Sequence, residues 1–367
     1  MRGPREEARA HLAALRGRQG RPLAFMEVCG THTMAAARMG LRGALPASIR
    51  LISGPGCPVC VTPVGTLDHA LALAARPEVT VATFGDLMRV PGSAAPGEEG
   101  EPPSLTSAKA AGADIRVVYS PNDALDAARA HPAREVVFLG VGFETTAPGI
   151  AAAILRARDE GLRNFSVLSA HKTIPGAMVL LASSGELRLD GFLCPGHVSI
   201  ILGPEAYEPV VAAARVPCVI AGFEPVEILR GLAALVAQAG RGEARVENAY
   251  GGAVRPGGNA RARAVMDEVF EPCDSVWRGL GTIPRSGLAI RPALASFDAA
   301  RRFEVSLPEP VEPAGCRCGD VLRGAVEPEE CPLFGTECTP DRPVGACMVS
   351  SEGSCAARFR YGEGAGG

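Results

Sequence analysis

Short apolar stretches alternate with alanine-rich segments between about residues 22 and 240. Apolar runs of this length are typical of buried strands, and the alanine-rich segments between them are typical of helices. The strands predicted in this way are 22–28, 49–53, 79–84, 115–119, 135–141, 164–169, 190–194 and 217–221. The predicted helices are 32–40, 64–76, 122–131, 148–160, 174–184, 205–214 and 224–239.

This alternation predicts an α/β fold in which mainly parallel sheets are covered by helices. The eight strands are compatible with one large sheet or with two smaller α/β units. The polar stretch 91–103, rich in Gly, Pro and Glu, is expected to be a surface loop, and the best internal boundary lies near 121–134. After residue 240 a Gly-rich segment, 250–259, leads into one helix, and irregular cysteine-rich sequence follows from residue 315.

Composition and charge narrow the class of protein. The chain has 367 residues, a net charge of −3 and no run of about 18 apolar residues, so we expect neither a nucleic-acid nor a membrane partner. The first twenty residues lack the apolar core of a signal peptide, so a cytoplasmic location is expected. In such a reducing compartment, twelve cysteines are better interpreted as metal ligands or redox thiols than as disulfides.

The strongest chemical signal is a group of six cysteines in the C-terminal segment. A segment with so few periodic apolar residues cannot easily bury a core of its own, and metal–thiolate bonds would supply the missing folding free energy. The spacing lacks the paired C-x₂-C knuckles of structural zinc sites, which favours an iron–sulfur cluster, although zinc and unligated thiols remain alternatives. The six residues are Cys316, Cys318, Cys331, Cys338, Cys347 and Cys355.

A second signal is the C-x-x-C pair Cys57 and Cys60, within the sequence GPGCPVC. In a reducing compartment such a pair is either redox-active or half of a metal site. The pair precedes the predicted helix 64–76, whose partial positive N-terminal charge would stabilise a thiolate. The alternative is two ordinary loop cysteines, which the surrounding Gly and Pro residues make less attractive.

Further candidates follow predicted strands directly, where parallel sheets bind ligands. Cys29 and His32, in CGTHT, are good ligands for a soft or borderline metal such as Fe(II). Three more polar clusters occupy similar positions, and we expect them to line one crevice, although each histidine alone could be structural. They are Glu144 with Thr146 in GFETTAP, His171 in SAHKTIP, and His197 in LCPGHVS.

The motifs CGTHT, GPGCPVC, GFETTAP, LCPGHVS and CPLFGTEC occur in this order between about Phe25 and Tyr361. Together they make the chain resemble the HypD family of [NiFe]-hydrogenase maturation factors. In that family the cluster cysteines are spaced C-x₁₄-C-x₆-C-x₁₆-C. The resemblance therefore implies that a [4Fe-4S] cluster is held by Cys316, Cys331, Cys338 and Cys355, whereas Cys318 and Cys347 are left over.

The resemblance also implies a function. HypD-type proteins act with the chaperone HypC as a scaffold for the transient Fe(CN)₂CO unit, and cyanide arrives from the HypE–HypF pair. The iron would lie between a cysteine of HypC and Cys29. The implied fold has two α/β domains and a third iron–sulfur domain like that of ferredoxin:thioredoxin reductase. In this chain we expect them at 20–121, at 122–242, and at 1–19 together with 243–367.

The expected roles follow from this resemblance and from the residue types. Cys57 and Cys60 would lie close to the cluster on one side and to Cys29 on the other, and would relay electrons. The incoming ligand would be polarised or hydrogen-bonded by Glu144, Thr146, His171 and His197. Such a chain is a redox-active assembly factor rather than a conventional turnover enzyme. The alternative is an iron–sulfur disulfide reductase of the ferredoxin:thioredoxin reductase type, and a zinc-stabilised binding module would leave the loop cysteines unexplained.

Overall fold

A computed structural model describes residues 3–94, 102–307 and 309–362, so the predicted loop 91–103 lies partly outside the described residues. Within these ranges no helix has both the length and the apolar character that a membrane span requires. The strands are β1 Leu23–Glu27, β2 Ile49–Ser53, β3 Val79–Thr83, β4 Ile115–Val117, β5 Glu135–Gly140, β6 Phe165–Ser169, β7 Gly191–Pro195, β8 Cys218–Ala221, β9 Val246–Asn248, β10 Phe270–Trp277 and β11 Gly281–Ile290.

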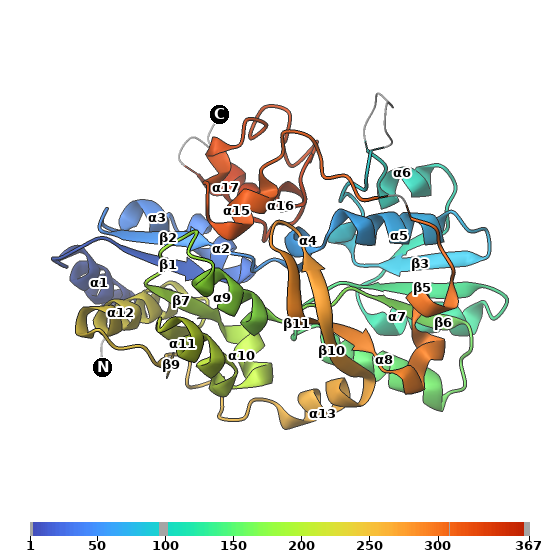
Figure 1. The fold of residues 1–367 in the computed structure, drawn as a ribbon, viewed down its shortest axis with the longest axis horizontal. Helices are drawn as coiled ribbons and strands as arrows, with labels where there is room; N and C mark the ends of the chain where they lie inside the picture. Colours follow the sequence, from blue (N-terminus) through green and yellow to red (C-terminus); the bar gives the residue numbers. More distant parts are fainter. Residues whose placement is uncertain (1–2, 95–101, 308, 363–367) are drawn as a thin grey trace.

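Helices follow most of these strands (Figure 1). The α-helices are α1 Pro4–Arg16, α2 Gly30–Arg38, α3 Leu41–Ala44, α4 Pro58–Val61, α5 Val64–Ala74, α6 Leu105–Ala110, α7 Pro121–Ala130, α8 Ala147–Asp159, α9 Ile174–Ser183, α10 Gly196–Leu202, α11 Glu208–Ala214, α12 Pro225–Arg241, α13 Ala260–Val269, α14 Ala299–Arg302, α15 Cys318–Arg323, α16 Ala346–Val349 and α17 Ser354–Tyr361. Short 3₁₀ helices are η1 Gly85–Leu87, η2 Pro204–Tyr207, η3 Pro292–Phe297 and η4 Pro328–Glu330.

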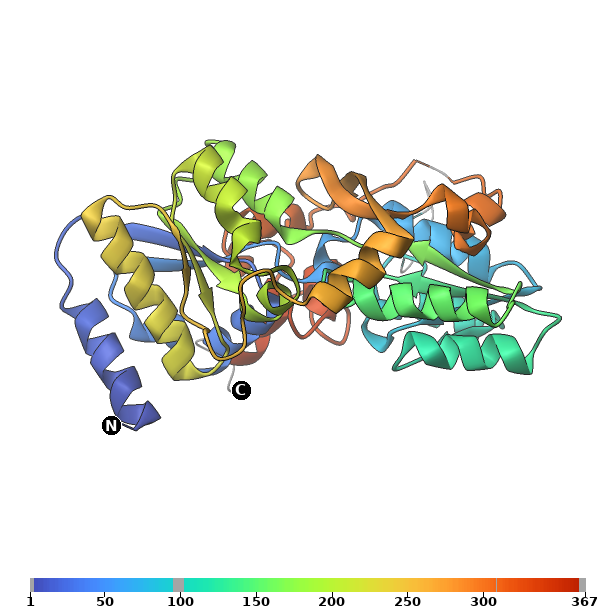
Figure 2. The ribbon, with the colours of Figure 1, turned by 90° about the horizontal axis from the view of Figure 1, so that it is seen from below.

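Two parallel sheets confirm the predicted α/β fold class. Sheet A has the strand order β2-β1-β7-β8-β9, and sheet B has the order β4-β3-β5-β6. All pairs within these two sheets are parallel, whereas β10 and β11 form an antiparallel hairpin. Each sheet forms one lobe of the molecule, and the lobes lie side by side along its long axis (Figure 2).

The predicted domain limits do not match the way in which the strands are divided between the two sheets. β1 and β2 pair with β7 in sheet A, whereas β3 and β4, which also precede residue 121, belong to sheet B. The N-terminal segment does not join the cysteine-rich region either, because α1 packs against α12, and Arg230 of α12 donates to Glu7 of α1. Similarly β9 extends sheet A. Apolar patterns identify strands, but they carry no information about which distant strands pair.

Both faces of each sheet are buried, as expected for parallel sheets. In β1, Leu23 and Phe25 face a core shared with α1, α2 and α12, while Met26 faces the opposite side. In sheet B, Phe138 faces a core with α7 and α8, and Val137 faces the other way. Met26 and Val137 belong to one continuous apolar core, which also includes parts of the cysteine-rich region.

The carboxyl edges of the two sheets face the same central region of the molecule (Figure 1). α2 and α4, which follow β1 and β2, lie there, and the C-terminal helices α15, α16 and α17 pack onto them. The hairpin β10–β11 reaches the same region from sheet B, where Phe143, just after β5, stacks on Trp277 with ring centroids 5.9 Å apart. Loops from both sheets and the cysteine-rich segment therefore meet in one place.

The strand pairing predicts which fragments of the chain fold alone. A fragment of residues 20–121 carries β1 to β4 but lacks β7 and β5, so we expect circular dichroism to show no cooperative urea unfolding. A fragment of residues 63–173 contains all of sheet B with α5 to α8, and it should unfold cooperatively. Cooperative unfolding of 20–121 would contradict the topology described here.

Candidate functional site

Cys29 lies at the junction between β1 and α2, where it is the N-cap residue of the helix. Its backbone N–H donates to the buried Glu27 carboxylate at 3.2 Å, and Gly30 N–H donates to Gly56 O at 2.8 Å. A Cβ atom on Gly56 would lie 2.1 Å from the Cys29 nitrogen, so a residue other than glycine could not stand there. The loop before Cys57 is thereby held directly against Cys29.

The environment of Cys29 favours the neutral thiol. Burial raises the pKa of Cys29 to about 12, and the charges of Glu27 and Glu352 act in the same direction. The backbone N–H groups of Thr31 and His32 act in the opposite direction but do not compensate. A thiolate at this position therefore needs a positive partner, such as a metal ion, to replace the proton.

His32 is a buried and uncharged imidazole on the first turn of α2, three residues after Cys29. Burial lowers the pKa of His32 to about 4. Its Nε2 lies 2.8 Å from Gly222 O, and because a carbonyl only accepts, we assign the proton to Nε2. Nδ1 then carries a lone pair and has no hydrogen-bond partner among the described residues. A neutral imidazole with an open ring nitrogen is the form that binds metal ions.

His197, which follows β7, joins the Cys29 side of the molecule. The ring of Phe223 lies between two imidazoles, with centroids 4.8 Å from His32 and 4.2 Å from His197. His197 is exposed, whereas His32 is fully buried. Sheet A therefore presents one buried and one accessible imidazole along the same carboxyl edge.

Glu144, Thr146 and His171 follow β5 and β6, and therefore lie at the edge of sheet B. Glu144 Oε1 accepts the Ile174 N–H at 3.0 Å, and His171 Nδ1 lies 2.9 Å from Ser169 Oγ. Glu144 Oε2 and His171 Nε2 have no partner among the described residues. Burial raises the pKa of Glu144 to about 7 and lowers that of His171 to about 3.

The structure thus divides the predicted crevice residues between two sheet edges. His197 stands with Cys29 and His32 on sheet A, whereas Glu144, Thr146 and His171 stand on sheet B. Thr146 packs over Gly142, where an added Cβ would lie 2.5 Å from its side chain. Among the described residues, no hydrogen bond, ion pair or ring contact joins the sheet B group to Cys29. The sequence pattern placed each residue after a strand but could not assign the strand to a sheet.

Cys57 and Cys60 lie on the single-turn helix α4, and Cys57 is its N-cap. The Cys60 N–H donates to Cys57 Sγ at 3.3 Å. Burial raises the pKa of Cys57 well above its ordinary value. Burial also acts to raise the pKa of Cys60, but the neighbouring thiols of Cys347 and Cys57 and the charge of Arg278 outweigh it and lower that pKa to about 6.

Cys347, which was left over in the sequence analysis, connects α4 to the C-terminal cysteines. The neighbouring thiols of Cys318, Cys355 and Cys60 raise the pKa of Cys347 well above its ordinary value. Cys60 Sγ also lies 3.9 Å from Ala346 O. The expectation that Cys60 lies close to the C-terminal cysteines on one side, with its loop close to Cys29 on the other, agrees with these contacts.

The four cysteines predicted to hold a cluster lie near one another at the C-terminal end of the chain. Burial raises the pKa of Cys316 to about 12, and its neighbours Cys318, Cys331 and Cys338 contribute to this increase. Cys338 Sγ accepts the Val344 N–H at 3.3 Å. A Cβ on Gly345 would lie 2.6 Å from Cys316 Sγ, so the glycine leaves room for the sulfur.

These observations fit an iron–sulfur cluster held by thiolates. Sulfur ligands of such clusters accept backbone N–H groups, as Cys338 does. Within residues 3–94, 102–307 and 309–362, no three His, Cys, Asp or Glu side chains converge closely enough to hold a single metal ion.

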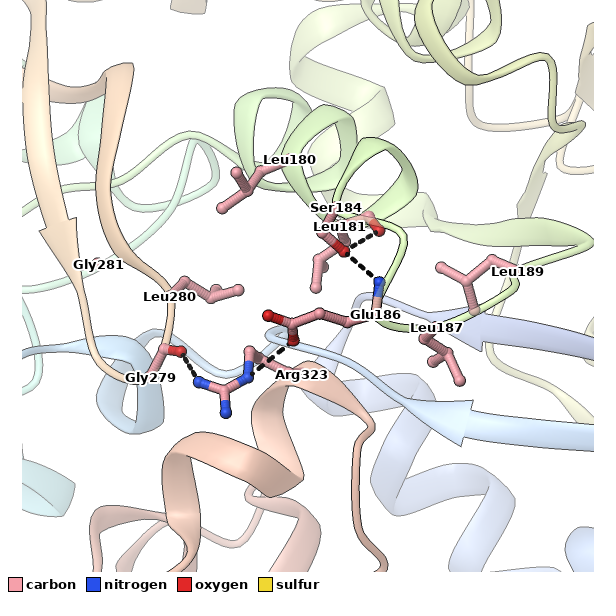
Figure 3. Close-up of a pocket in the computed structure, with 10 residues that line it drawn as sticks. All are labelled: Leu180, Leu181, Ser184, Glu186, Leu187, Leu189, Gly279, Leu280, Gly281 and Arg323. Atoms are coloured by element: carbon pink, nitrogen blue, oxygen red, sulfur yellow. Dashed lines mark hydrogen bonds and ion pairs between the residues drawn. The ribbon is translucent and has the colours of Figure 1, made fainter.

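A separate cavity of about 330 Å³ lies beside the hairpin turn (Figure 3). Arg323 of α15 crosses its floor, donating to Gly279 O at 2.5 Å and pairing with Glu186 at 3.3 Å. Leucine side chains form much of its wall: Leu180, Leu181, Leu187, Leu189 and Leu280. None of the predicted site residues lines this cavity, and its main interest is the anchoring of the hairpin to α15.

Several site residues were missed in the sequence analysis. Glu27 ends an apolar strand two residues before CGTHT, and a carboxylate in that position was a usable signal. Glu352 accepts the Thr31 hydroxyl at 2.8 Å and fills the space above Gly30, where a Cβ would lie 2.5 Å from its side chain. Arg278 belongs to a hairpin that was not predicted. No local sequence pattern indicated a role for Glu352 or Arg278, because each contacts a segment far away in the sequence: Glu352 contacts Thr31, and Arg278 contacts Thr62.

The fold and the site define a two-lobed α/β protein with thiol and imidazole side chains at the edge of a sheet and a cysteine-rich C-terminal region. The family model HypD, described as Hydrogenase formation hypA family, matches residues 6–362. The chain is 49% identical over 345 residues to Hydrogenase maturation factor HypD of Rhizobium leguminosarum bv. viciae, covering 92% of this chain and 88% of that protein. The chain belongs to the HypD family of hydrogenase maturation factors.

Other relatives have the same description. Hydrogenase maturation factor HypD of Azotobacter vinelandii is 48% identical over 344 residues, covering 92% of this chain and 89% of its own. The protein of that name from Escherichia coli (strain K12) is 44% identical over 344 residues, covering 93% and 90%. The similarity therefore extends over both sheets and the cysteine-rich region.

The buried carboxyl of Glu144 predicts a pH dependence of stability. Its pKa is raised in the folded state, so the folded protein keeps a proton that the unfolded chain releases. The stability from this group is present below about pH 4.5 and is lost as the pH rises through 7, a change of up to about 3 kcal/mol. In Glu144→Gln, urea titrations at pH 5 to 8 should show a flatter decline in the free energy of unfolding than in the wild type.

Glu208→Gln, on the exposed first turn of α11, is the matched control and should leave the pH dependence unchanged. Parallel stability curves for the wild type and Glu144→Gln would show that this carboxyl does not titrate as its burial implies.

Proposed function

We propose that this chain is the scaffold on which the Fe(CN)₂CO unit of [NiFe]-hydrogenase is assembled in the cytoplasm. The iron would be bound between Cys29 and a cysteine of a HypC-type chaperone, and cyanide would come from a HypE-type protein working with HypF. The observation that carries this proposal is the buried Cys29 thiol at the N-cap of α2, followed on the same helix by a neutral His32 whose Nδ1 has no partner in the described structure. Membership of the HypD family supports the same role.

Binding of iron as the substrate requires Cys29 to lose its proton. Burial by itself opposes the loss of the proton. A divalent cation beside the sulfur would stabilise the thiolate and so favour the loss. Glu27 accepts the Cys29 backbone N–H, and burial raises the pKa of this carboxyl to about 7. We assign Glu27 to take up the thiol proton, because a group with a pKa near the working pH can both accept and release it.

The C-terminal cysteines supply the redox part of the proposal. A [4Fe-4S] cluster bound by Cys316, Cys331, Cys338 and Cys355 would provide electrons one at a time. Cys57 and Cys60 can change between a disulfide and two thiols, a change of two electrons and two protons. Cys347, whose pKa is raised by the neighbouring thiols of Cys355 and Cys60, would be a third thiol between the two groups.

The remaining polar groups would act on the ligand that reaches the iron. His197 is exposed on the Cys29 side, where it can donate to an incoming cyanide or carbonyl ligand. We assign Glu144, Thr146 and His171, on the facing edge of sheet B, to ligands that enter between the sheets. A neutral His171 and a largely protonated Glu144 below pH 7 suit hydrogen bonding to a small anion.

The alternative function, an iron–sulfur disulfide reductase, rests on the thiol contacts between α4 and the C-terminal cysteines. A reductase must present a nucleophilic thiol to the disulfide of a partner. Cys57 is 3% exposed and Cys60 is 0% exposed, so neither thiol is accessible in the described conformation. This burial favours an internal relay over reduction of a partner protein.

The scaffold proposal predicts infrared bands that depend on Cys29. We expect the protein, purified anaerobically with a HypC-type partner, to contain iron and sulfide and to show bands in the CN and CO stretching region. Cys29→Ala should abolish those bands while keeping the iron and sulfide of the cluster, because the C-terminal cysteines are unchanged.

Cys273→Ala, at a partly exposed position on β10, is the matched control and should retain the bands. Bands of unchanged intensity in Cys29→Ala would show that Cys29 does not bind the iron of the assembly site. Zinc in place of iron and sulfide would contradict the cluster.

A further inference from the structure

The turn of the hairpin β10–β11 reaches across to the helix that carries Cys57 and Cys60. The backbone N–H of Arg278 donates to Val61 O at 2.9 Å, and its Nε donates to Thr62 O at 3.0 Å. These carbonyl groups lie at and just after the C-terminal end of α4, where backbone acceptors have no partner within the helix. One residue of the hairpin thus caps the C-terminal end of the C-x-x-C helix.

The guanidinium of Arg278 is buried close to Cys60. Its side chain is 3% exposed, and its Nη1 pairs with Glu312, whose side chain is 55% exposed. A buried charge interacts strongly with its neighbours because little water screens it. Several groups act on the Cys60 thiol: Cys347, Cys57 and Arg278 favour the thiolate, Glu352 opposes it, and Cys355 also interacts with it electrostatically.

The hairpin turn is itself firmly held. Gly279 packs against Gly319, beside Cys318, so closely that a Cβ on Gly279 would lie 2.4 Å from the Gly319 Cα. Arg323 of α15 donates to the Gly279 carbonyl, as Figure 3 shows. The turn therefore contacts two cysteine-bearing helices, α4 and α15, and it fixes the position of the Arg278 charge relative to both.

We propose that Arg278 is a positioning residue for the Cys57–Cys60 pair: it holds α4 by its terminal carbonyl groups and places a permanent positive charge that stabilises the Cys60 thiolate. This inference rests on the proposed redox role of that pair and deepens it. It predicts that Cys60, rather than the helix N-cap Cys57, is the thiolate of the reduced pair.

The positive charge of Arg278 affects only the reduced form of the Cys57–Cys60 pair. Breaking the Cys57–Cys60 bond takes two electrons and two protons to give two thiols, or two electrons and one proton when Cys60 remains a thiolate. A positive neighbour stabilises the thiolate product but not the neutral disulfide. Arg278 therefore makes the disulfide easier to reduce, as stabilising the reduced form does in strongly oxidising thiol proteins.

The test compares the reduction of this pair in the full-length protein. The wild type and variants are equilibrated anaerobically in glutathione buffers of known potential, trapped in acid, and alkylated for mass analysis of the peptide that contains Cys57 and Cys60. At pH 8 we expect Arg278→Gln to lower the equilibrium constant for reduction about tenfold, which is about 30 mV for a two-electron couple. At pH 5 the difference should disappear, because Cys60 is then protonated in both proteins.

Three further variants separate charge from structure. Arg278→Lys keeps the charge and should restore most of the wild-type value, even if the hairpin is weakened. Glu312→Gln removes the partner of the guanidinium and should shift the equilibrium in the opposite direction. Arg285→Gln, at an exposed position in the same hairpin, changes the net charge equally and should have no effect.

The outcomes distinguish this inference from the function on which it rests. If the wild-type pair forms no disulfide at any potential, the redox part of the proposed function fails. If the pair cycles but Arg278→Gln matches the wild type at pH 8, or differs equally at pH 5 and pH 8, the role assigned to Arg278 is wrong. Should Arg278→Gln not fold, the opposite shift in Glu312→Gln still decides the question.

Discussion

Burial in an apolar interior is the constraint under which the thiols of this protein operate. Moving a thiolate out of water raises its free energy, so a buried cysteine stays protonated unless a specific partner compensates. Cys29 and Cys316 lack such a partner in the described structure, and their pKa values rise to about 12. Cys60 has partners in Cys57, Cys347 and Arg278, and its pKa falls instead. In the proposed function, metal binding would provide this compensation for Cys29 and Cys316.

Close backbone contacts at glycine bring these thiols together. Gly56 presses the C-x-x-C loop against Cys29, Gly345 admits the sulfur of Cys316, and Gly279 lets the hairpin touch α15. At each position a Cβ would come within 3 Å of a neighbouring atom. The site therefore depends on glycines that allow close backbone contact as well as on its reactive side chains. An alanine at Gly56 would move the Cys57–Cys60 loop away from Cys29 without removing any of these thiols.

The sequence predicted local structure well and long-range pairing poorly. All eight predicted strands are present, because a buried parallel strand is a short apolar run that needs no distant information. The assignment of β1 and β2 to the same sheet as β7 could not be predicted, because pairing is decided by loop paths and packing. Consequently Cys29 and His32 were recognised from their motif, whereas Arg278 and Glu352, which act across segments far apart in the chain, were not.

The position of β7 at the centre of sheet A has a consequence for synthesis. β1 leaves the ribosome early, but its inner neighbour β7 ends at Pro195, so sheet A stays open until more than half of the chain has emerged. At typical translation rates this delay is on the order of ten seconds or more. During that interval Cys29, Cys57 and Cys60 have neither the sheet nor the C-terminal helices over them. These thiols are therefore most exposed to oxidation and mispairing before the last cysteines of the chain have been made.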